Sequence, residues 1–421
     1  MKITIMTLGS RGDVQPYVAL GIGLKKAGYD VCIATHPTFK EFIKNYGLDF
    51  HPVVPDSPKE FLNSKNGQIF SSGKRLTSFV GGYLFFKMFK SYLEQMLEDC
   101  HEACQGSGLI INSMMSPGHL VAEKLGIPCI MAGLWPASPT RVYPHPIVPF
   151  SFSGSFNMIS HKIAEYLMWR IFGTPANNWR KRNGMPLFTR AADIFGYVRE
   201  KKYPWIFGFS PALLPKPEDW QEHIHITGYW FLDEPEDWTP PPDLQKFIDS
   251  GTPPVYIGFG SMIHGDTTRV TDIVIKALKK SGQRGIMLSG WSGLGKEEMP
   301  DNIFTASSIP HNWLFPRMSA LIHHGGSGTC AAGFKAGVPT LVIPFMTDQF
   351  FWGRYIARVG AGPAPLQKGK LTVNRLAEAI KEMVTNENMH GNAKKLGEHI
   401  REESGVKNAV EVIKDFTSSY N

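Results

Sequence analysis

The chain has 421 residues, which is too long for one ordinary hydrophobic core and predicts two domains. A hydrophobic content of 43% with 19% charged residues excludes a disordered chain, and the absence of any run of 18 apolar residues excludes a transmembrane helix. The formal net charge of +7 is modest, and it suits anionic ligands or an anionic membrane surface without requiring either.

The five cysteines are too few, and odd in number, for a disulfide framework, so we expect reduced thiols. Cys100 and Cys104 lie four residues apart on a predicted helix, but a metal site would need two more ligands nearby. The N-terminus enters a strand directly, without the apolar stretch and cleavage site of a signal peptide. These features predict a cytoplasmic protein, and peripheral attachment to a membrane stays open.

The first part of the chain alternates strands with helices. Hydrophobic patterning predicts strands at residues 2–8, 30–35 and 48–54, with helices at 17–27 and 37–46 between them. This βαβαβ order indicates a parallel sheet, because parallel neighbours need a crossover between them.

After a polar loop at 56–75, a long helical stretch at 76–104 carries many aromatic residues. The next expected strands are 109–112, 129–134, 205–209 and 225–227, and the next helices are 118–125, 161–172 and 176–183. A Pro- and aromatic-rich loop at 135–156 interrupts this series, and loops of that length are usually functional.

An acidic, Pro-rich segment at 232–254 is the predicted linker, and a second α/β series follows it. We therefore predict an N-terminal domain at 1–231 and a C-terminal domain beginning at 255. The second series begins with the stretch 255–261, which contains a glycine turn at 258–261, and its further expected strands are 284–289, 303–306, 318–322 and 340–344. Its expected helices are 270–281, 330–336, 349–358, 372–385 and 389–415.

One stretch, residues 322–349, combines a strand, a glycine-rich turn at 324–329, a short helix, a second strand and a polar tip. A helix that starts behind a glycine turn presents free N–H groups and a positive dipole end, which suit a phosphate. The candidate diphosphate ligands are these N–H groups, the Thr329 hydroxyl and His324. A plain strand-to-helix turn is the alternative interpretation.

Two further polar features lie at predicted sheet edges. Asp348 and Gln349 offer acceptors and donors for sugar hydroxyls, although an N-cap with a solvated glutamine is an equal alternative. Asp13 follows the glycine turn 9–13, where we expect the helix dipole to keep it ionised. Such a carboxylate could take a proton from an attacking hydroxyl, or it could only cap the helix.

No metal site is expected. The chain contains no D-x-D triplet, so helix dipoles and hydrogen-bond donors would have to neutralise a diphosphate. The adjacent His323 and His324 leave a strand and should point to opposite faces. The aromatic residues of 79–89 and 135–156 suggest an apolar acceptor pocket or a membrane-touching patch, although those of 79–89 could equally be core.

Seven motifs, in order, resemble the nucleotide-sugar glycosyltransferases with two Rossmann-like domains (GT-B), and among them the sterol glucosyltransferases. The motifs are G-S-R-G-D-V-Q-P (9–16), G-F-G-S-M (258–262), S-G-W-S-G-L (289–294), I-P-H-N-W-L-F (309–315), H-H-G-G-S-G-T (323–329), A-G-V-P (336–339) and D-Q-F-F-W (348–352). The resemblance implies α/β domains at 1–231 and 255–404 facing across a cleft, and a helix at 405–421 packing back on the N-terminal domain.

The resemblance also implies roles for individual residues. Asp13 would be the general base. The implied donor-binding residues are Ser10, Arg11, Gly260, Ser261, Trp291, Ile309, His311, His324, Gly326, Ser327, Gly328, Thr329, Asp348 and Gln349. The acceptor-binding candidates are Phe79, Tyr83, Met115, Trp135 and Tyr143. Ser308 and Ala332 depart from the plant signature, which leaves the stacking on uracil and the recognition of ribose without assigned residues.

The implied reaction is an inverting transfer of glucose from UDP-glucose to a sterol or similar hydrophobic alcohol by a monomer, without a metal or other cofactor and without nucleic acid. A polyketide, flavonoid or glycopeptide acceptor is the first alternative. A binding protein without turnover is another, although the presence of Asp13, Asp348 and Gln349 together argues against it. A sugar-nucleotide epimerase would need further carboxylates.

Overall fold

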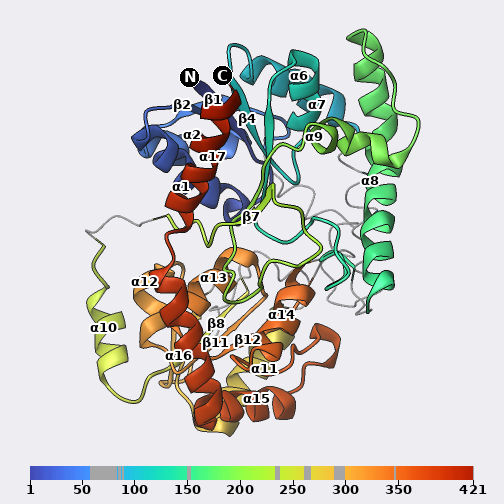
Figure 1. The fold of residues 1–421 in the computed structure, drawn as a ribbon. Helices are drawn as coiled ribbons and strands as arrows, with labels where there is room; N and C mark the ends of the chain where they lie inside the picture. The colour runs from blue at the N-terminus through green and yellow to red at the C-terminus, as the bar shows by residue number, and fades with distance from the viewer. Residues whose placement is uncertain are drawn as a thin grey trace. The chain divides into compact units, whose positions relative to one another are not determined.

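The computed structural model describes residues 1–56, 83, 87, 90–148, 153–232, 238–259, 267–288, 299–345 and 348–420. The described residues form two compact units (Figure 1). The first unit contains the described residues up to Leu232 and again from Glu403 onward, and the second contains the described residues from 238 to Glu402.

The first unit is built on a parallel sheet with the strand order β3-β2-β1-β4-β5-β6-β7. Its strands are β1 (Lys2–Met6), β2 (Asp30–Thr35), β3 (Asp49–Pro52), β4 (Leu109–Ser113), β5 (Cys129–Gly133), β6 (Trp205–Phe207) and β7 (Ile224–Ile226). β4 and β5 are buried at every position, as expected of strands that are covered on both faces.

Helices cover this sheet and supply much of the core. They are α1 (Arg11–Lys26), α2 (Lys40–Asn45), α6 (Leu93–Ala103), α7 (Gly118–Leu125), α8 (Ser155–Arg182), α9 (Gly196–Glu200) and α17 (Gly405–Tyr420), with 3₁₀ turns η1 (Pro37–Phe39) and η2 (Ala191–Phe195). Val14 and Leu20 of α1 pack into one cluster with Ile5 and Ile111 of the strands. The sheet and its core therefore place the start of α1 at the carboxyl end of β1.

α8 is one helix where the sequence predicted two, at 161–172 and 176–183, and Pro175 lies in the stretch between them. A proline inside a helix removes one backbone hydrogen bond and costs about 3 kcal/mol. Ile171, Pro175 and Trp179 are all buried, so packing on this face of the helix offsets the lost bond.

α17 returns to the first unit and packs along α1. A side-chain methyl group at Gly23 would lie 2.5 Å from Cγ1 of Val406, so the two helices meet at a glycine. Asn408 donates a hydrogen bond to the Thr227 carbonyl (2.9 Å), and the hydroxyl groups of Tyr29 and Thr417 lie 2.8 Å apart. The end of the chain is thus an integral part of the first unit.

The second unit has a parallel sheet with the order β10-β9-β8-β11-β12. The strands are β8 (Val255–Gly258), β9 (Gly285–Leu288), β10 (Ile303–Ala306), β11 (Ala320–His323) and β12 (Thr340–Val342). The helices are α10 (Pro242–Asp249), α11 (Thr267–Ser281), α12 (His311–Leu314), α13 (Ser327–Ala336), α14 (Asp348–Arg358), α15 (Val373–Thr385) and α16 (Glu387–Glu402), with 3₁₀ turns η4 (Phe315–Arg317) and η5 (Lys368–Lys370). Two parallel-sheet α/β domains confirm the predicted fold class.

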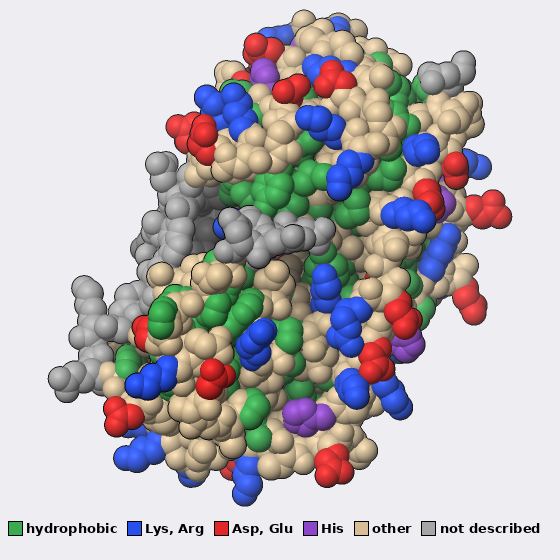
Figure 2. Space-filling model, turned by 90° about the vertical axis from the view of Figure 1, so that its left-hand side faces the viewer, with side chains coloured by type: hydrophobic (Ala, Val, Ile, Leu, Met, Phe, Trp, Pro, Cys, Tyr) green, Lys and Arg blue, Asp and Glu red, His purple; other side chains and the backbone are tan. Residues whose placement is uncertain are grey.

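The segment predicted as a linker contains α10, and its Leu244 is buried in one cluster with Tyr256 and Phe315 of the second unit. On the face shown in Figure 2, Lys and Arg side chains are interspersed with Asp and Glu. Within the described ranges, no helix combines the length and the apolar composition needed to cross a membrane.

Candidate active site

Asp13 lies in the first turn of α1, directly after β1. Its Oδ2 accepts hydrogen bonds from the backbone N–H of Ser10 (2.7 Å) and from the Ser10 hydroxyl (2.8 Å). Gly9 precedes this turn with φ +134°, and a Cβ atom there would lie only 2.5 Å from Asp13 Oδ2. The glycine therefore lets the carboxylate fold back over the start of the helix.

Burial raises the pKa of Asp13 above its ordinary value, although the two hydrogen bonds from Ser10 act in the opposite direction. Loss of water disfavours the charged form, so burial works against the ionisation that the helix dipole was expected to favour. The hydroxyl of Tyr17 is close enough for the Asp13 charge to add to the rise in its pKa, and it donates to the Ala132 carbonyl (2.9 Å). Asp13 is thus a half-buried carboxyl suited to accept a proton.

His36 is a neighbour of this turn that sequence reasoning missed. Its Nε2 accepts a hydrogen bond from the Gly9 N–H (3.1 Å), so Nδ1 carries the proton and donates to the Pro55 carbonyl (2.6 Å). It follows β2, which pairs with β1, so the two turns meet at one sheet edge. That position after a neighbouring strand is the signal that could have identified it.

Ser10 and Arg11, the other two predicted residues of this turn, differ in their contacts. The Ser10 side chain is exposed. Arg11 donates from Nε to Gln15 (3.1 Å), and its guanidinium lies 4.9 Å from the ring centre of Phe42. Contacts with α1 and α2 therefore hold the Arg11 side chain.

In the second unit, the glycine turn follows β11 at the carboxyl edge of the sheet. His323 pairs with Gly258 of β8 and with Val342 of β12, so the ends of three parallel strands meet at this level. Gly325 has φ +92°, and a Cβ atom there would lie 2.5 Å from Val342 and 3.3 Å from Gln349. Only glycine fits this turn, both by its backbone conformation and by the space available.

The two histidines of the turn are held neutral. His323 is fully buried, and its Nδ1 accepts a hydrogen bond from the Gly325 N–H (3.0 Å), so the proton of the neutral ring lies on Nε2. Burial lowers the pKa of His323 well below its usual value, and the nearby His324 and His311 add to this. Burial also lowers the pKa of His324 to about 4, although a hydrogen bond with the Gly258 backbone acts to raise it.

The first turn of α13 presents the predicted phosphate-binding residues. Gly326 is the N-cap, Gly328 is exposed, and Ser327 and Thr329 are half-buried. The ring of His324 lies over the cap, since a Cβ at Gly326 would be 2.6 Å from its Nε2. The helix start is therefore open to an anion while an imidazole flanks it.

Asp348 and Gln349 begin α14 beside this turn. The charge of Asp348 contributes to raising the pKa of buried Cys330 in α13. Gln349 is 3% exposed, and its Oε1 accepts a hydrogen bond from the Phe345 N–H (2.8 Å). The structure thus brings the turn and the Asp348-Gln349 tip together, and it uses one acceptor of Gln349 to fix the segment before α14.

The predicted uracil neighbours lie on β10–α12. Ile309 is buried in the cluster that contains Tyr256 and Phe315. His311 stacks on Phe315 with ring centres 4.3 Å apart, and its Nε2 is 3.4 Å from the Tyr256 hydroxyl. Ile309 is therefore a packing residue that could meet a ligand mainly through its backbone. Four other candidates, Phe79, Gly260, Ser261 and Trp291, lie outside the described residues.

The acceptor candidates fall into different environments. Trp135 is half-buried and its ring contacts His145, which in turn contacts His161. His161 Nε2 lies 3.2 Å from the Tyr143 carbonyl. Tyr143 is 2% exposed, which makes it a packing residue of its loop. Two candidates are more open. Met115 is exposed and Tyr83 is half-buried.

No group of three or more His, Cys, Asp or Glu that could hold a metal ion occurs among the described residues.

Two family models match the chain. The glycosyltransferase family 28 N-terminal domain matches residues 3–144, and the erythromycin biosynthesis protein CIII-like C-terminal domain matches residues 286–416. A sterol 3-beta-glucosyltransferase of Cryptococcus neoformans var. neoformans serotype D is 38% identical over 98% of this chain and 27% of its own length. One of Yarrowia lipolytica is also 38% identical, over 98% of this chain and 28% of its own length.

The chain has the two-domain fold of the GT-B glycosyltransferases.

The chain spans less than a third of the length of these curated relatives. A solved structure described as the glycotransferase of kitacinnamycin is similar with a TM-score of 0.72 and 18% identity, and the match covers 98% of each chain. At that identity the structural match supports the two-domain fold.

Proposed function

We propose that this glycosyltransferase moves glucose from UDP-glucose to the hydroxyl group of a sterol or a similar hydrophobic alcohol, with inversion at the anomeric carbon. The match of nearly the whole chain to sterol 3-beta-glucosyltransferases supports the substrate class. The observation that carries the chemistry is Asp13, a half-buried carboxyl with a raised pKa at a glycine-bordered helix start.

Asp13 is the general base of the proposed reaction. The acceptor oxygen forms a bond to the anomeric carbon while its proton passes to the Asp13 carboxylate. The bond between that carbon and the diphosphate oxygen breaks, and UDP leaves with the electron pair. A raised pKa makes Asp13 a stronger base than an exposed aspartate, while the hydrogen bonds from Ser10 hold Oδ2 in a fixed position.

The leaving group is proposed to lie at the start of α13. The N–H groups behind Gly326 and the positive end of the helix dipole would stabilise the growing charge on the diphosphate. The ring of His324, which lies over the helix cap, would flank the diphosphate. Asp348 and Gln349 would hold the glucose hydroxyls, and we propose that no metal is required.

A natural product with a flat ring system is the alternative acceptor. The match of residues 286–416 to the erythromycin biosynthesis protein CIII-like C-terminal domain favours this class. The two alternatives share the donor and the chemistry and differ only in the acceptor.

The test uses the purified chain, UDP-glucose, and panels of sterols and of flavonoids and polyketides, with products identified by mass. A sterol glucoside is expected. Glucosides formed only from the second panel would replace the sterol assignment. An absence of product from both panels, with UDP-glucose shown to bind, would overturn the proposed transferase activity.

A further inference from the structure

The first half of α8 exposes a row of large apolar side chains. Phe156 is 65% exposed, Ile159 46%, Ile163 47% and Tyr166 49%. Their spacing of three, four and three residues places them on one face of the helix. We call these four residues the α8 stripe. Single exposed apolar residues are common on protein surfaces, but four in three turns of one helix mark an interaction surface.

The opposite face of the same turns is already packed. Asn157, Ser160 and Ala164 are buried, and Asn157 donates a hydrogen bond to the Arg141 carbonyl (2.8 Å). That bond holds the loop before α8 against the helix, and the next residue in the loop, Val142, is 52% exposed. The stripe is therefore the outward face of a helix whose inward face is anchored in the first unit.

Cations border the stripe. Lys162 and Arg170 are exposed on α8 within four residues of stripe residues in the sequence, and Arg141 is exposed in the loop before the helix. Glu165 is the one carboxylate in the sequence of α8, and it accepts a hydrogen bond from Arg199 (2.7 Å). The charge that α8 itself places along the apolar row is thus positive, because its one carboxylate is paired with Arg199.

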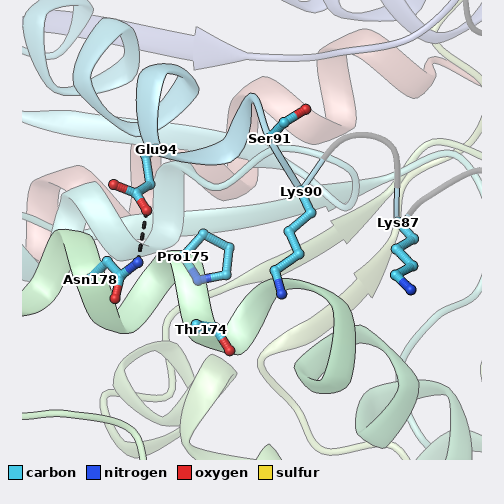
Figure 3. A pocket seen from close by; sticks show the side chains of 7 residues that line it. All are labelled: Lys87, Lys90, Ser91, Glu94, Thr174, Pro175 and Asn178. Carbon is cyan, nitrogen blue, oxygen red and sulfur yellow. Dashed lines mark hydrogen bonds between the residues drawn. The ribbon is translucent and has the colours of Figure 1, made fainter.

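One helical turn beyond Arg170, α8 forms one wall of an open groove of about 370 Å³. Figure 3 shows Lys87 and Lys90 on the other wall, pointing to the same side, with Lys90 reaching toward Thr174 of α8. Glu94 also lines the groove, but its carboxylate is bonded to Asn178 (2.9 Å) and Arg182 (2.5 Å). The positive edge therefore continues past the end of the stripe.

We propose that the α8 stripe docks on an anionic lipid bilayer, with its apolar side chains in the interface and Arg141, Lys162, Arg170, Lys87 and Lys90 against lipid phosphates. An apolar helix face bordered by lysine and arginine is the pattern that binds a membrane surface without crossing it. The inference rests on the proposed function in one respect, since a sterol acceptor resides in a bilayer. Docking would bring the first unit to that acceptor.

The experiment is flotation of the full chain with vesicles of phosphatidylcholine alone and of phosphatidylcholine with phosphatidylserine. The chain is expected to float with the anionic vesicles and far less with the neutral ones. Ile159→Ser with Ile163→Ser should weaken partition about tenfold, because two half-exposed apolar side chains no longer enter the interface. Lys162→Gln with Arg170→Gln should weaken it about tenfold on anionic vesicles only.

The matched control is Leu187→Ser, which removes a side chain that is 51% exposed outside the stripe and should not alter flotation. Equal flotation of the wild type and the isoleucine variant would overturn the proposal, as would failure of the wild type to float. A dimer in sedimentation velocity that the isoleucine variant abolishes would assign the stripe to a second copy instead.

Sterol glucoside formation in detergent micelles, measured on the same preparations, separates this proposal from the proposed function. If the reaction in micelles proceeds but the chain does not float with vesicles, only the docking proposal is overturned. If the chain floats with vesicles but forms no sterol glucoside in micelles, only the proposed function is overturned.

Discussion

Asp13 is held by two hydrogen bonds from Ser10 while burial works against its charge. Asp13→Asn keeps the size and an acceptor oxygen but cannot take a proton. We expect turnover to fall about 10²- to 10⁴-fold, which is the usual contribution of a general base. Because the variant removes a buried charge, its melting temperature should equal or exceed that of the wild type. Product formation and thermal unfolding measure the two effects, and unchanged turnover would refute the assignment of the base.

The raised pKa of Asp13 also predicts a pH dependence. The base must be ionised, so turnover should fall as the pH drops through the pKa of Asp13. Since burial raises that pKa, the fall should begin at a higher pH than for an exposed aspartate. A pH–rate profile tests this. The fall in turnover at low pH should be absent from the profile of the residual activity of Asp13→Asn. An unaltered fall in the variant would show that another group titrates.

His323 fixes the glycine turn through one hydrogen bond. Its Nδ1 accepts from the Gly325 N–H, which would otherwise be buried without a partner. His323→Leu should therefore cost about 1–3 kcal/mol of stability and weaken UDP binding. His323→Asn supplies a carbonyl oxygen as an acceptor, so it should lose less stability and less UDP affinity than His323→Leu. Calorimetry of UDP binding and thermal unfolding compare the pair, and equal behaviour of the two variants would rule out the positioning role.

At the scale of elements, two helical glycines provide a matched test of the packing of α17 on α1. A methyl group at Gly23 would meet Val406 at 2.5 Å, whereas one at Gly391 of α16 would meet nothing within 4 Å. Gly23→Ala should cost about 1–3 kcal/mol by overpacking, while Gly391→Ala should gain up to about 1 kcal/mol from helix propensity. Urea unfolding measures both, and a gain at both positions would contradict the close approach.

The element scale also shows where local patterns fail. The sequence predicted two helices where α8 continues through Pro175, and the proline-rich segment before Val255 contains α10 because Leu244 packs into an apolar cluster. In the opposite sense, one predicted helix at 389–415 is two, α16 and α17, which are separated at Glu403 and Ser404. Gly405 lies against the backbone of Gly228 there, and the hydroxyl of Ser210 donates to Glu403. The hydrophobic periodicity of a segment carries no information on contacts between residues so far apart in sequence.

At the scale of the whole molecule, the last helix completes the first unit. Ala409, Val410 and Ile413 of α17 are buried in the cluster formed by β1, β2 and α1. A chain that ends at Glu402 should therefore lose the first unit's unfolding transition or shift it to a lower temperature, and keep that of the second unit. Scanning calorimetry tests this, with a chain that ends at Ser418 as the control. A single unshifted transition would contradict the division into units.

The sequence by itself determined the α/β class, the parallel sheets and the glycine turns, because strand periodicity and glycine positions are local signals. It also placed Asp13 and the His324–Thr329 turn directly after strands, which sets them at carboxyl edges of sheets. Only the tertiary structure decided the rest, including the raised pKa of Asp13, the contact of His36 with Gly9 and the burial of Tyr143. Each of these depends on residues that are far apart in the sequence and that only the fold brings together. Neither the spacing of residues nor the composition of the chain encodes such contacts.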